Sequence, residues 1–500
     1  MDINSINSTA YQGLQMAQAG MLVTSQNVSG SSVDGFSKRN ANFIIDSMSP
    51  NAKNSTGTAF AVDGFVRQYS ALINSQVMNQ QAQTGYTDTL VNYTTAINSL
   101  VADPTAGLST SIANFFSAMG TYATNPTSPS SQAAITGAAN QVSAGMARMV
   151  TMVSQLGSNS KAGLQSTVDQ VNTFLPQLAS INQQIIQANA GGKNTGVSAD
   201  MLDQRDLILG KIQSLVGGQS LINNDGTATQ LIGGLPLVER STANKLLVTN
   251  LDNPILKVQF APAALNGGGG IQEVNGTIGG QAGALMDLVK QFVPLVNQRL
   301  NTMAQGLVSL ANNASGASAA SGGALKIFGF VTAAGTFGDT RATGGDITNQ
   351  IPVTNTDAAM ANLYTQNGTD GLGLVALGLT AANFVSLAPS KTSLYVNAGT
   401  SAPFITAAAA NTVQQLSTLM GNSVASLVSD VGNQVATWSS NQRANEAILV
   451  NLNNQKSSVS GVNLDEEAAN LLKFQQLYQA SSKVLQVGND MFRSILDIMN

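Results

Sequence analysis

The 500-residue chain contains neither cysteine nor histidine. Without cysteine it has no disulfide bond, no thiolate nucleophile and no sulfur ligand for a metal. Without histidine it cannot build imidazole-dependent catalytic triads or the usual histidine-ligated zinc sites. The sequence therefore predicts a protein that is not an enzyme and that needs no cofactor or metal. The missing cysteines fit an exported protein without disulfides and a cytosolic protein equally well.

Charged residues are also scarce, at 10% of the chain, and the net charge is −4 at pH 7. This composition offers no basic field for a phosphate backbone, so nucleic-acid binding is not expected. Uncharged polar surfaces lack the like-charge repulsion that keeps copies apart, which favours self-association. No run of about twenty apolar residues occurs, so the sequence predicts no membrane span. No Lys or Arg precedes Lys38, and we expect no cleaved signal peptide.

The segment that follows Gly461 has the spacing of one long amphipathic helix. Asn463 followed by Glu466 is typical of an N-cap and its reciprocal carboxylate, so the helix should begin just after Gly461. Asp465, Glu466 and Glu467 would then complement the positive end of the helix dipole. Leu477, Val484, Met491 and Ile498 widen the apolar face, whose main stripe is formed by Leu464, Ala468, Leu471, Phe474, Tyr478, Leu485, Phe492, Ile495 and Met499.

The N-terminal segment has a similar stripe, and residues 30–35 (GSSVDG) should end its helix. A helix of about forty residues spans about 60 Å and cannot bury its stripe by folding back on itself. The two terminal stripes can therefore pair with each other or with other copies of the chain. We predict that both form an assembly interface. Its N-terminal members are Ala10, Leu14, Ala17, Met21 and Val28, together with Thr24.

Four stretches resemble one known family. Residues 463–492 (NLDEEAANLLKFQQLYQASSKVLQVGNDMF) are similar to the C-terminal signature of flagellar axial proteins, and the LDEEAANLL run resembles the hook-associated protein 1 family, whose members join hook to filament. Residues 11–39 resemble the start of that family, with Gly35, Phe36 and Ser37 in place of its Gly-Tyr-Ser. MLDQRDLILGKI from Met201 and GGQAGALMDL from Gly279 resemble internal blocks.

The resemblance implies a structural role in the bacterial flagellum, at the hook–filament junction, outside the cell and after type III export. It implies an inner tube of terminal helices, surrounded by a helical bundle with β domains facing outward. The implied partners are other copies of the chain, the hook protein, a second hook-associated protein adjoining the filament, and an export chaperone that covers the C-terminal helix.

The pattern between the termini predicts a mainly α fold with β-rich insertions. Residues 1–40 plus 457–500 are assigned to a terminal helical layer, and 41–214, 281–314 and 408–456 to a helical bundle. Residues 215–280 form a β-rich insertion and 315–407 an outer β-rich domain, with strand-like runs at 324–331 and 392–399. If the two ends pair, the molecule is a rod with both termini at one pole and the insertions farthest from them.

Several local features complete this prediction. The stripe from Leu164 to Ile185 continues past Pro176, which favours a kink over a stop. Further helices are expected over 281–312 and 408–455, and Trp438 lies on the apolar stripe of the second, where it should pack in the core. Residues 224–226 (NDG) predict a hairpin turn.

The sequence contains only weak signals for a ligand-binding site. Asp203 and Asp206 flank Arg205 and could in principle act as paired carboxylates, although a local salt-bridge network is the better interpretation. Residues 191–195 lack the spacing of a phosphate loop, and 223–226 lack the ligands of a calcium loop. The glycines at 267–270 fit a flexible connection.

Two alternative functions remain. The chain could be another flagellar axial subunit, of the hook or rod type, because these share similar terminal helices. It could also be a secreted adhesin acting through residues 315–407.

Overall fold

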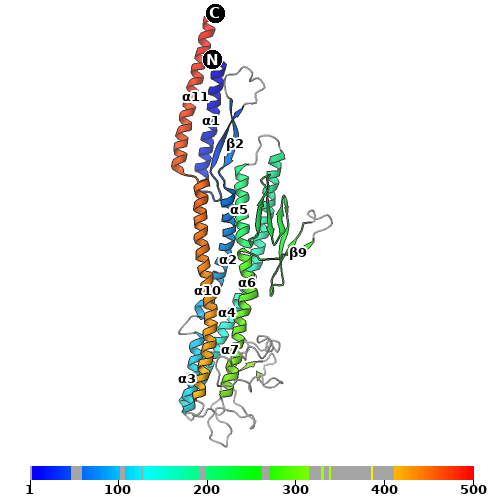
Figure 1. Ribbon diagram of the computed structural model, residues 1–500, viewed down its shortest axis with the longest axis vertical. Helices are drawn as coiled ribbons and strands as arrows, with labels where there is room; N and C mark the ends of the chain where they lie inside the picture. The colour runs from blue at the N-terminus through cyan, green and yellow to red at the C-terminus, as the bar shows by residue number, and fades with distance from the viewer. Residues whose placement is uncertain are drawn as a thin grey trace.

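The computed structural model describes residues 3–46, 59–101, 107–124, 128–190, 198–261, 270–314, 328–331, 337–338, 384–386 and 410–499. They form a long, mainly helical rod (Figure 1), as the sequence predicts. Helix α1 begins and helix α11 ends at the same end of the rod, and α3 lies near the opposite end. The helices are α1 (Ile3–Gly30), α2 (Ala71–Val101), α3 (Leu108–Thr124), α4 (Pro129–Ala190), α5 (Ala199–Val216), α6 (Gly280–Asp287), α7 (Val293–Ala314), α10 (Ala410–Ser460) and α11 (Leu464–Met499).

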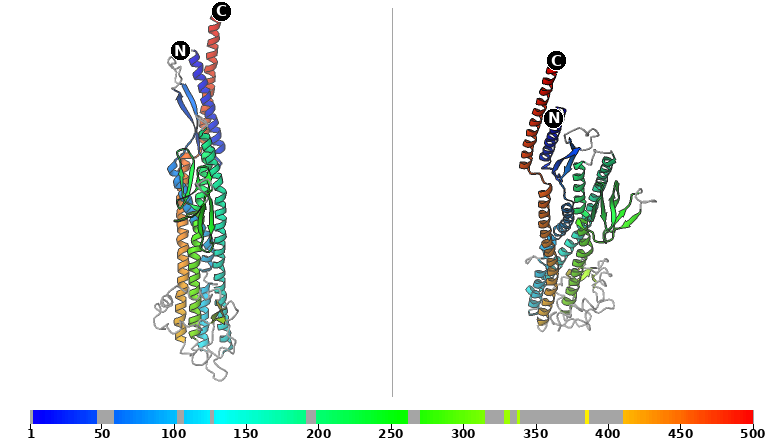
Figure 2. Two further views of the ribbon diagram at one scale, coloured as in Figure 1. Left: turned by 90° about the vertical axis from the view of Figure 1, so that its right-hand side faces the viewer. Right: turned by 45° about the horizontal axis from the view of Figure 1, so that its top comes forward.

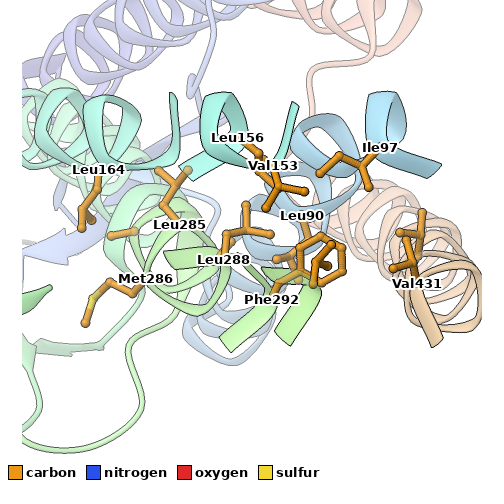
Figure 3. Packing of buried hydrophobic residues seen from close by; sticks show 14 of the residues in the cluster. Leu90, Ile97, Val153, Leu156, Leu164, Leu285, Met286, Leu288, Phe292 and Val431 are labelled. Atoms are coloured by element: carbon orange, nitrogen blue, oxygen red, sulfur yellow. The ribbon is translucent and has the colours of Figure 1, made fainter. Parts of the chain in front are cut away.

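The bundle of α2 to α7 and α10 is held by apolar stripes with helical spacing. Every predicted stripe residue of α4 is buried: Leu164, Val168, Val171, Leu175, Leu178, Ile181 and Ile185. The helix runs through Pro176 to Ala190, so the expectation that Pro176 does not end it is confirmed. Figure 3 shows side chains from α2, α4 and the α6 region meeting in this core, among them Leu90, Val153 and Leu288.

The helix predicted over 281–312 is interrupted by one π-helical turn, η2 (Leu288–Phe292), between α6 and α7. Pro294 lies two residues after the end of this turn, and a proline inside a helix has no N–H to donate and clashes with the carbonyl four residues earlier. The N–H of Val293 accordingly bonds to the carbonyl of Leu288, five residues back. The wider turn lets the chain stay helical at this proline.

Helix α10 packs differently in its two halves. The first half buries Met420, Val424, Leu427, Val431 and Val435. Trp438 is half-buried and packs on Phe292, with ring centroids 5.2 Å apart, which agrees with its predicted place in the core.

The second half of α10 binds α2 through amide and carboxylate groups. Gln80 Nε2 donates to the carbonyl of Asn445 (3.0 Å), and Gln442 Nε2 donates to Asp88 Oδ1 (3.0 Å). Beyond Trp438 the helix is largely exposed.

Seven strands within 219–261 and 270–273 form two small antiparallel sheets beside the bundle. One contains β3 (Gln219–Ile222), β4 (Ala228–Ile232), β5 (Leu235–Glu239) and β6 (Thr242–Ala243); the other contains β7 (Lys245–Thr249), β8 (Ile255–Gln259) and β9 (Ile271–Glu273). The prediction of a β-rich insertion is confirmed. Its expected position is wrong, because the sheets lie along the side of the rod and not at the end farthest from the termini (Figures 1 and 2).

Two asparagines of α4 explain this position. Asn182 Nδ2 donates to the carbonyl of Ala228 (2.7 Å) while its Oδ1 accepts the N–H of Ala228 (2.9 Å). Asn172 makes the same pair of bonds to Leu246, at 2.8 and 2.9 Å. Each sheet is therefore attached to α4 by a side-chain amide that mimics a neighbouring strand.

Asp225 stabilises the predicted hairpin turn between β3 and β4. Its Oδ1 accepts from the N–H (3.0 Å) and the hydroxyl (2.6 Å) of Thr227, and these bonds lower the pKa of Asp225. Replacing Asp225 with alanine should cost about 1 kcal/mol and speed amide exchange in β3 and β4 about fivefold. Because the pKa of Asp225 is lowered in the folded protein, the difference in stability between the native chain and the variant should be present at neutral pH. It should disappear as the pH falls through the folded-state pKa. Asn224→Ala is the control, and equal exchange in both variants would contradict the argument.

The structure differs from the domain prediction at the start of residues 41–214, which were assigned to the helical bundle, because a β-hairpin lies there. Strands β1 (Arg39–Asp46) and β2 (Ala59–Arg67) pair antiparallel, with a bulge opposite Asn42 and Phe43. The extra residue is Asp63 of β2, and its neighbour Gly64 has φ +118°, a conformation that favours glycine. The hairpin packs against α1.

Little of 315–407 is described. Strands β10 (Phe328–Val331), β11 (Phe337–Gly338) and β12 (Phe384–Ser386) form an antiparallel sheet, and β10 falls within the predicted strand at 324–331. The predicted strand at 392–399 lies outside the described residues.

Candidate assembly surface

Helices α1 and α11 form an antiparallel pair (Figure 1), joined along a seam of mostly small residues. On α11 the seam residues recur every seven positions: Glu467, Phe474, Ser481 and Gly488. On α1 they recur at three- and four-residue steps: Ala10, Gly13, Ala17, Gly20, Thr24 and Asn27. This is the period of a coiled coil, with small residues at the positions that usually hold large ones.

Glycines set how closely the two helices approach. A Cβ added to Gly20 would overlap the ring of Phe474, and one added to Gly13 would overlap the hydroxyl of Ser481. Gly13 and Gly20 are seven residues apart, as are Phe474 and Ser481. Each glycine therefore receives one α11 side chain, which lets the backbones pack more closely than two leucine stripes would.

Most of the predicted C-terminal stripe lies beside this seam and not in it. Five of its members lie three residues before or four residues after a seam residue. Four of these five are exposed, and we call them the first flank: Leu464, Leu471, Tyr478 and Phe492. The fifth, Leu485, is half-buried. Three other apolar residues lie three after a seam residue and form the second flank: Leu477, Val484 and Met491. These seven side chains are between 36% and 54% exposed. Steps of three and four residues diverge to opposite sides of a helix, so α11 has an uncovered apolar flank on each side of α1.

The other predicted interface residues are distributed as follows. Ala10 and Ala17 are buried in the seam, and Leu14, Met21, Phe474 and Leu485 are half-buried. Val28 and Ala468 are exposed. Ile495 and Met499 lie in α11 beyond the last side chain that the structure describes. Gly13, Gly20 and Asn27, which complete the seam, were not predicted, because a search for large apolar residues passes over them.

A cluster of charges lies where the terminal pair meets the bundle. Lys38 Nζ contacts Glu466 Oε2 (2.8 Å) and Glu467 Oε1 (3.4 Å). Burial lowers the pKa of Lys38, but the bond to Glu466 and the charges of both glutamates outweigh it and leave the pKa raised. Asn463 caps α11 as predicted, since its Oδ1 accepts from the N–H of Asp465 (3.0 Å). Glu466 binds Lys38, whereas the sequence predicts a reciprocal bond to the cap.

Three arginines and three aspartates attach the hairpin to α5. Arg39 pairs with Asp200, Arg67 Nη1 contacts Asp203 Oδ1 (3.1 Å) and Asp206 Oδ2 (2.8 Å), and Arg205 Nη2 contacts Asp206 Oδ1 (2.7 Å). The local network predicted around Arg205 is therefore only half right. Asp206 joins it, but Asp203 binds arginines from the hairpin, more than a hundred residues earlier in the chain.

The same cluster holds Tyr69, whose ring lies under Arg67 with the guanidinium carbon 4.0 Å from its centroid. Burial raises the pKa of Tyr69, and the charge of Asp206 adds to this. All three aspartates are paired with arginines, and Asp203 and Asp206 are also buried, which is the arrangement of a structural network and not of a free acid–base pair.

Within the described ranges, no group of three or more acidic residues is placed to hold a metal ion. A groove of about 1090 Å³ runs between α2 and α4, lined by Tyr93, Ile97, Met152 and Leu156 among others. Among the described helices, none combines the length and apolarity needed to cross a membrane.

Comparison with known proteins gives matches over most of the chain. Residues 94–325 match the flagellar hook-associated protein FlgK helical domain, and 454–498 match the flagellar basal body rod FlgEFG protein C-terminal region. The flagellar hook-associated protein 1 of Escherichia coli is 25% identical and that of Salmonella typhimurium 26%, each over 99% of this chain and 100% of the relative. A solved structure of the flagellar hook junction protein FlgK from Burkholderia pseudomallei is 25% identical, with a TM-score of 0.45, and the match covers 51% of this chain and 46% of that one.

The end-to-end matches and the helical-domain match agree with one another and with the mainly helical rod described above. The chain is therefore similar along its whole length to flagellar hook-associated proteins, which are parts of the bacterial flagellum, and its residues 94–325 match the FlgK helical domain.

Proposed function

We propose that the chain is a hook–filament junction protein that assembles with further copies through the two flanks of α11. The observation that carries this proposal is the pair of uncovered apolar flanks, one on each side of the α1–α11 seam. Fully burying a leucine-sized side chain contributes roughly 1.5–3 kcal/mol, so seven such residues supply a strong drive for association. Because the two flanks differ, a neighbour on each side makes a heterologous contact, which repeats without closing into a dimer.

A place at the hook–filament junction implies particular partners. Copies of the chain would cover the flanks within the junction, with the hook protein on one side and a second hook-associated protein toward the filament on the other. Before assembly the flanks need another cover, and an export chaperone bound to α11 would supply it during type III export. We also propose that residues 1–40 and 457–500 act as the assembly layer, that the helices within 41–214, 281–314 and 408–456 carry it as a bundle, and that 215–280 and 315–407 face outward.

Charge placed on either flank tests the assembly step. Leu471→Asp on the first flank and Leu477→Asp on the second should each weaken self-association about 10- to 100-fold, because each removes apolar burial and would bury a carboxylate. Gln476→Asp, exposed on the opposite face of α11, is the matched control and should associate like the native chain. Sedimentation velocity gives the association constants. Native association by both flank variants would refute the proposal.

The place in the flagellum distinguishes a junction protein from a hook or rod subunit. Antibody-gold electron microscopy of intact flagella should label only the hook–filament boundary. Label along the whole hook or within the rod would instead make the chain another axial subunit.

A further inference from the structure

The terminal pair is attached to the bundle over a short stretch of chain. Helix α10 ends at Ser460 and α11 begins at Leu464, and within the described residues α11 packs extensively only on α1. Figures 1 and 2 show the pair extending beyond the bundle and stepping aside from the line of α10 at this break. We call residues 461–463 the joint. Its geometry sets the direction in which the flanks point.

One attachment lies at the end of α1. Asn27 Nδ2 donates to the carbonyl of Arg39 (2.9 Å), and the N–H of Arg39 donates to Asn27 Oδ1 (2.9 Å). Arg39 is itself paired with Asp200 of α5, and the neighbouring N–H of Ser37 donates to Asp203 Oδ2 (3.2 Å). The end of α1 is therefore fixed to the bundle through the hairpin and α5.

The second attachment lies at the start of α11 and depends on one residue. The backbone of Lys38 is held by the bundle side, since its N–H donates to the carbonyl of Ser460 (2.8 Å) and its carbonyl accepts from the N–H of Gln68 (2.7 Å). Its side chain crosses the joint to Glu466 and Glu467 in the first turn of α11. The Lys38 and Glu467 side chains are only 8% and 1% exposed, so solvent screens their pairing weakly.

A rod held at two points keeps one direction, whereas a rod held at one point can swing about it. We propose that the Lys38 ion pairs are a clasp that fixes the orientation of the α1–α11 pair on the bundle, and that releasing the clasp lets the intact pair pivot about the joint. Lys38 contacts one seam residue, Glu467. The contacts of the two α1 seam glycines with Ser481 and Phe474 do not involve Lys38, so the two helices stay together when the clasp opens. This inference goes beyond the junction role and does not depend on which neighbours cover the flanks.

The test needs a chain whose terminal pair cannot separate. Gly13→Cys with Ser481→Cys provides it, because an added Cβ at Gly13 lies 3.2 Å from the Cβ of Ser481, near the separation of about 3.5–4.5 Å in a disulfide. The chain has no other cysteine, so only this bond can form. Spin-labelled unnatural amino acids at Asn451 of α10 and Gln475 of α11, both exposed, report the angle across the joint by pulsed electron paramagnetic resonance.

In the locked chain the inter-label distance should be narrowly distributed, and Lys38→Met should broaden it. Gln475 lies about 18 Å along α11 from the joint, so a swing of about 20° moves it by about 6 Å. Lys38→Arg, which keeps the charge, should preserve the narrow distribution. Lys473→Met, at an exposed position on α11, should also preserve it.

A second variant separates the clasp from the effect of leaving Glu467 buried without a partner. Lys38→Met combined with Glu467→Gln removes the unpaired charge, and the distribution should still be broad. A narrow distribution in this double variant, or in Lys38→Met alone, would overturn the clasp.

The clasp and the junction proposal fail separately. Lys38→Met leaves both flanks unchanged, so it should still self-associate in sedimentation. A narrow distribution with normal association would remove only the clasp, whereas native association of both flank variants would remove only the assembly proposal.

Discussion

Replacing Gly13 and Gly20 together with leucine should separate α1 from α11 and abolish self-association. A leucine at Gly20 would occupy the place of the Phe474 ring, and one at Gly13 the place of Ser481. Overpacking of this kind costs about 1–3 kcal/mol per site, and helix backbones can relieve it only by moving apart. Hydrogen exchange should then show fast-exchanging amides in both helices, with the bundle unchanged.

The control for this prediction uses glycines that are also helical but have free space around them. A Cβ added to Gly120 of α3 or Gly432 of α10 would meet nothing within 4 Å. Leucine there should be neutral or stabilising by up to about 1 kcal/mol, because glycine is a poor helix former. If the Gly13 and Gly20 double variant kept slow exchange in α1 and α11, the seam described here would be incorrect.

The seam shows why the sequence predicted the terminal helices but not how they meet. Large residues such as Leu471 and Tyr478 dominate any search for an apolar stripe, so they identified α11 as amphipathic, and the cap at Asn463 marked where it begins. The centre of the contact is formed by Gly13, Gly20 and Ser481, which carry little apolar weight. Their importance depends on the distance between two helices more than four hundred residues apart in the chain, and no local pattern records that distance.

The bundle was more predictable because its signal is local. The stripes of α4, α7 and α10 repeat with the helical period, and residues such as Val171, Leu300 and Val431 are buried as expected. The position of the two small sheets was not predictable in the same way. It depends on Asn172 and Asn182, whose amides bond to strand backbones 74 and 46 residues later, and an asparagine on a helix gives no sign of such a partner.

The charged cluster is the strongest case of this kind. Asp203 and Asp206 are separated from Arg67 by 136 and 139 residues, so the sequence suggested only their neighbour Arg205 as a partner. The hairpin that brings Arg67 to them was itself not predicted, because its residues were assigned to the helical bundle. Once the hairpin is in place, every member of the cluster links two elements, and its loss should affect more than one of them.

Arg205→Met should therefore cause a large loss of stability. Arg205 is 1% exposed; its Nε and Nη2 donate to Asp206 Oδ1 (3.0 and 2.7 Å), and its Nη1 donates to the carbonyl of Gly226 in the β3–β4 turn. Without Arg205, Asp206 Oδ1 loses both of these donors, and the Asp206 carboxylate is left with Arg67, which it shares with the buried carboxylate of Asp203. Breaking a buried ion pair costs about 3–5 kcal/mol, and because Arg67 stays in place we expect the lower end of this range. For a chain of 500 residues the expected fall in Tm is about 3–5 °C.

Two further variants test the role of the Arg205 guanidinium. Arg205→Lys keeps the charge but loses the fork of donors that reaches Asp206 and Gly226 together, so its loss should be intermediate. Arg443→Met, on the exposed face of α10, should change stability by no more than about 0.5 kcal/mol. Arg205 joins α5 to the β3–β4 turn and shares Asp206 with the β1–β2 hairpin. Hydrogen exchange in Arg205→Met should therefore become faster both in β3 and β4 and in the hairpin. A rise confined to one of them, or an unchanged Tm, would show that the cluster does not couple the hairpin and the insertion through α5.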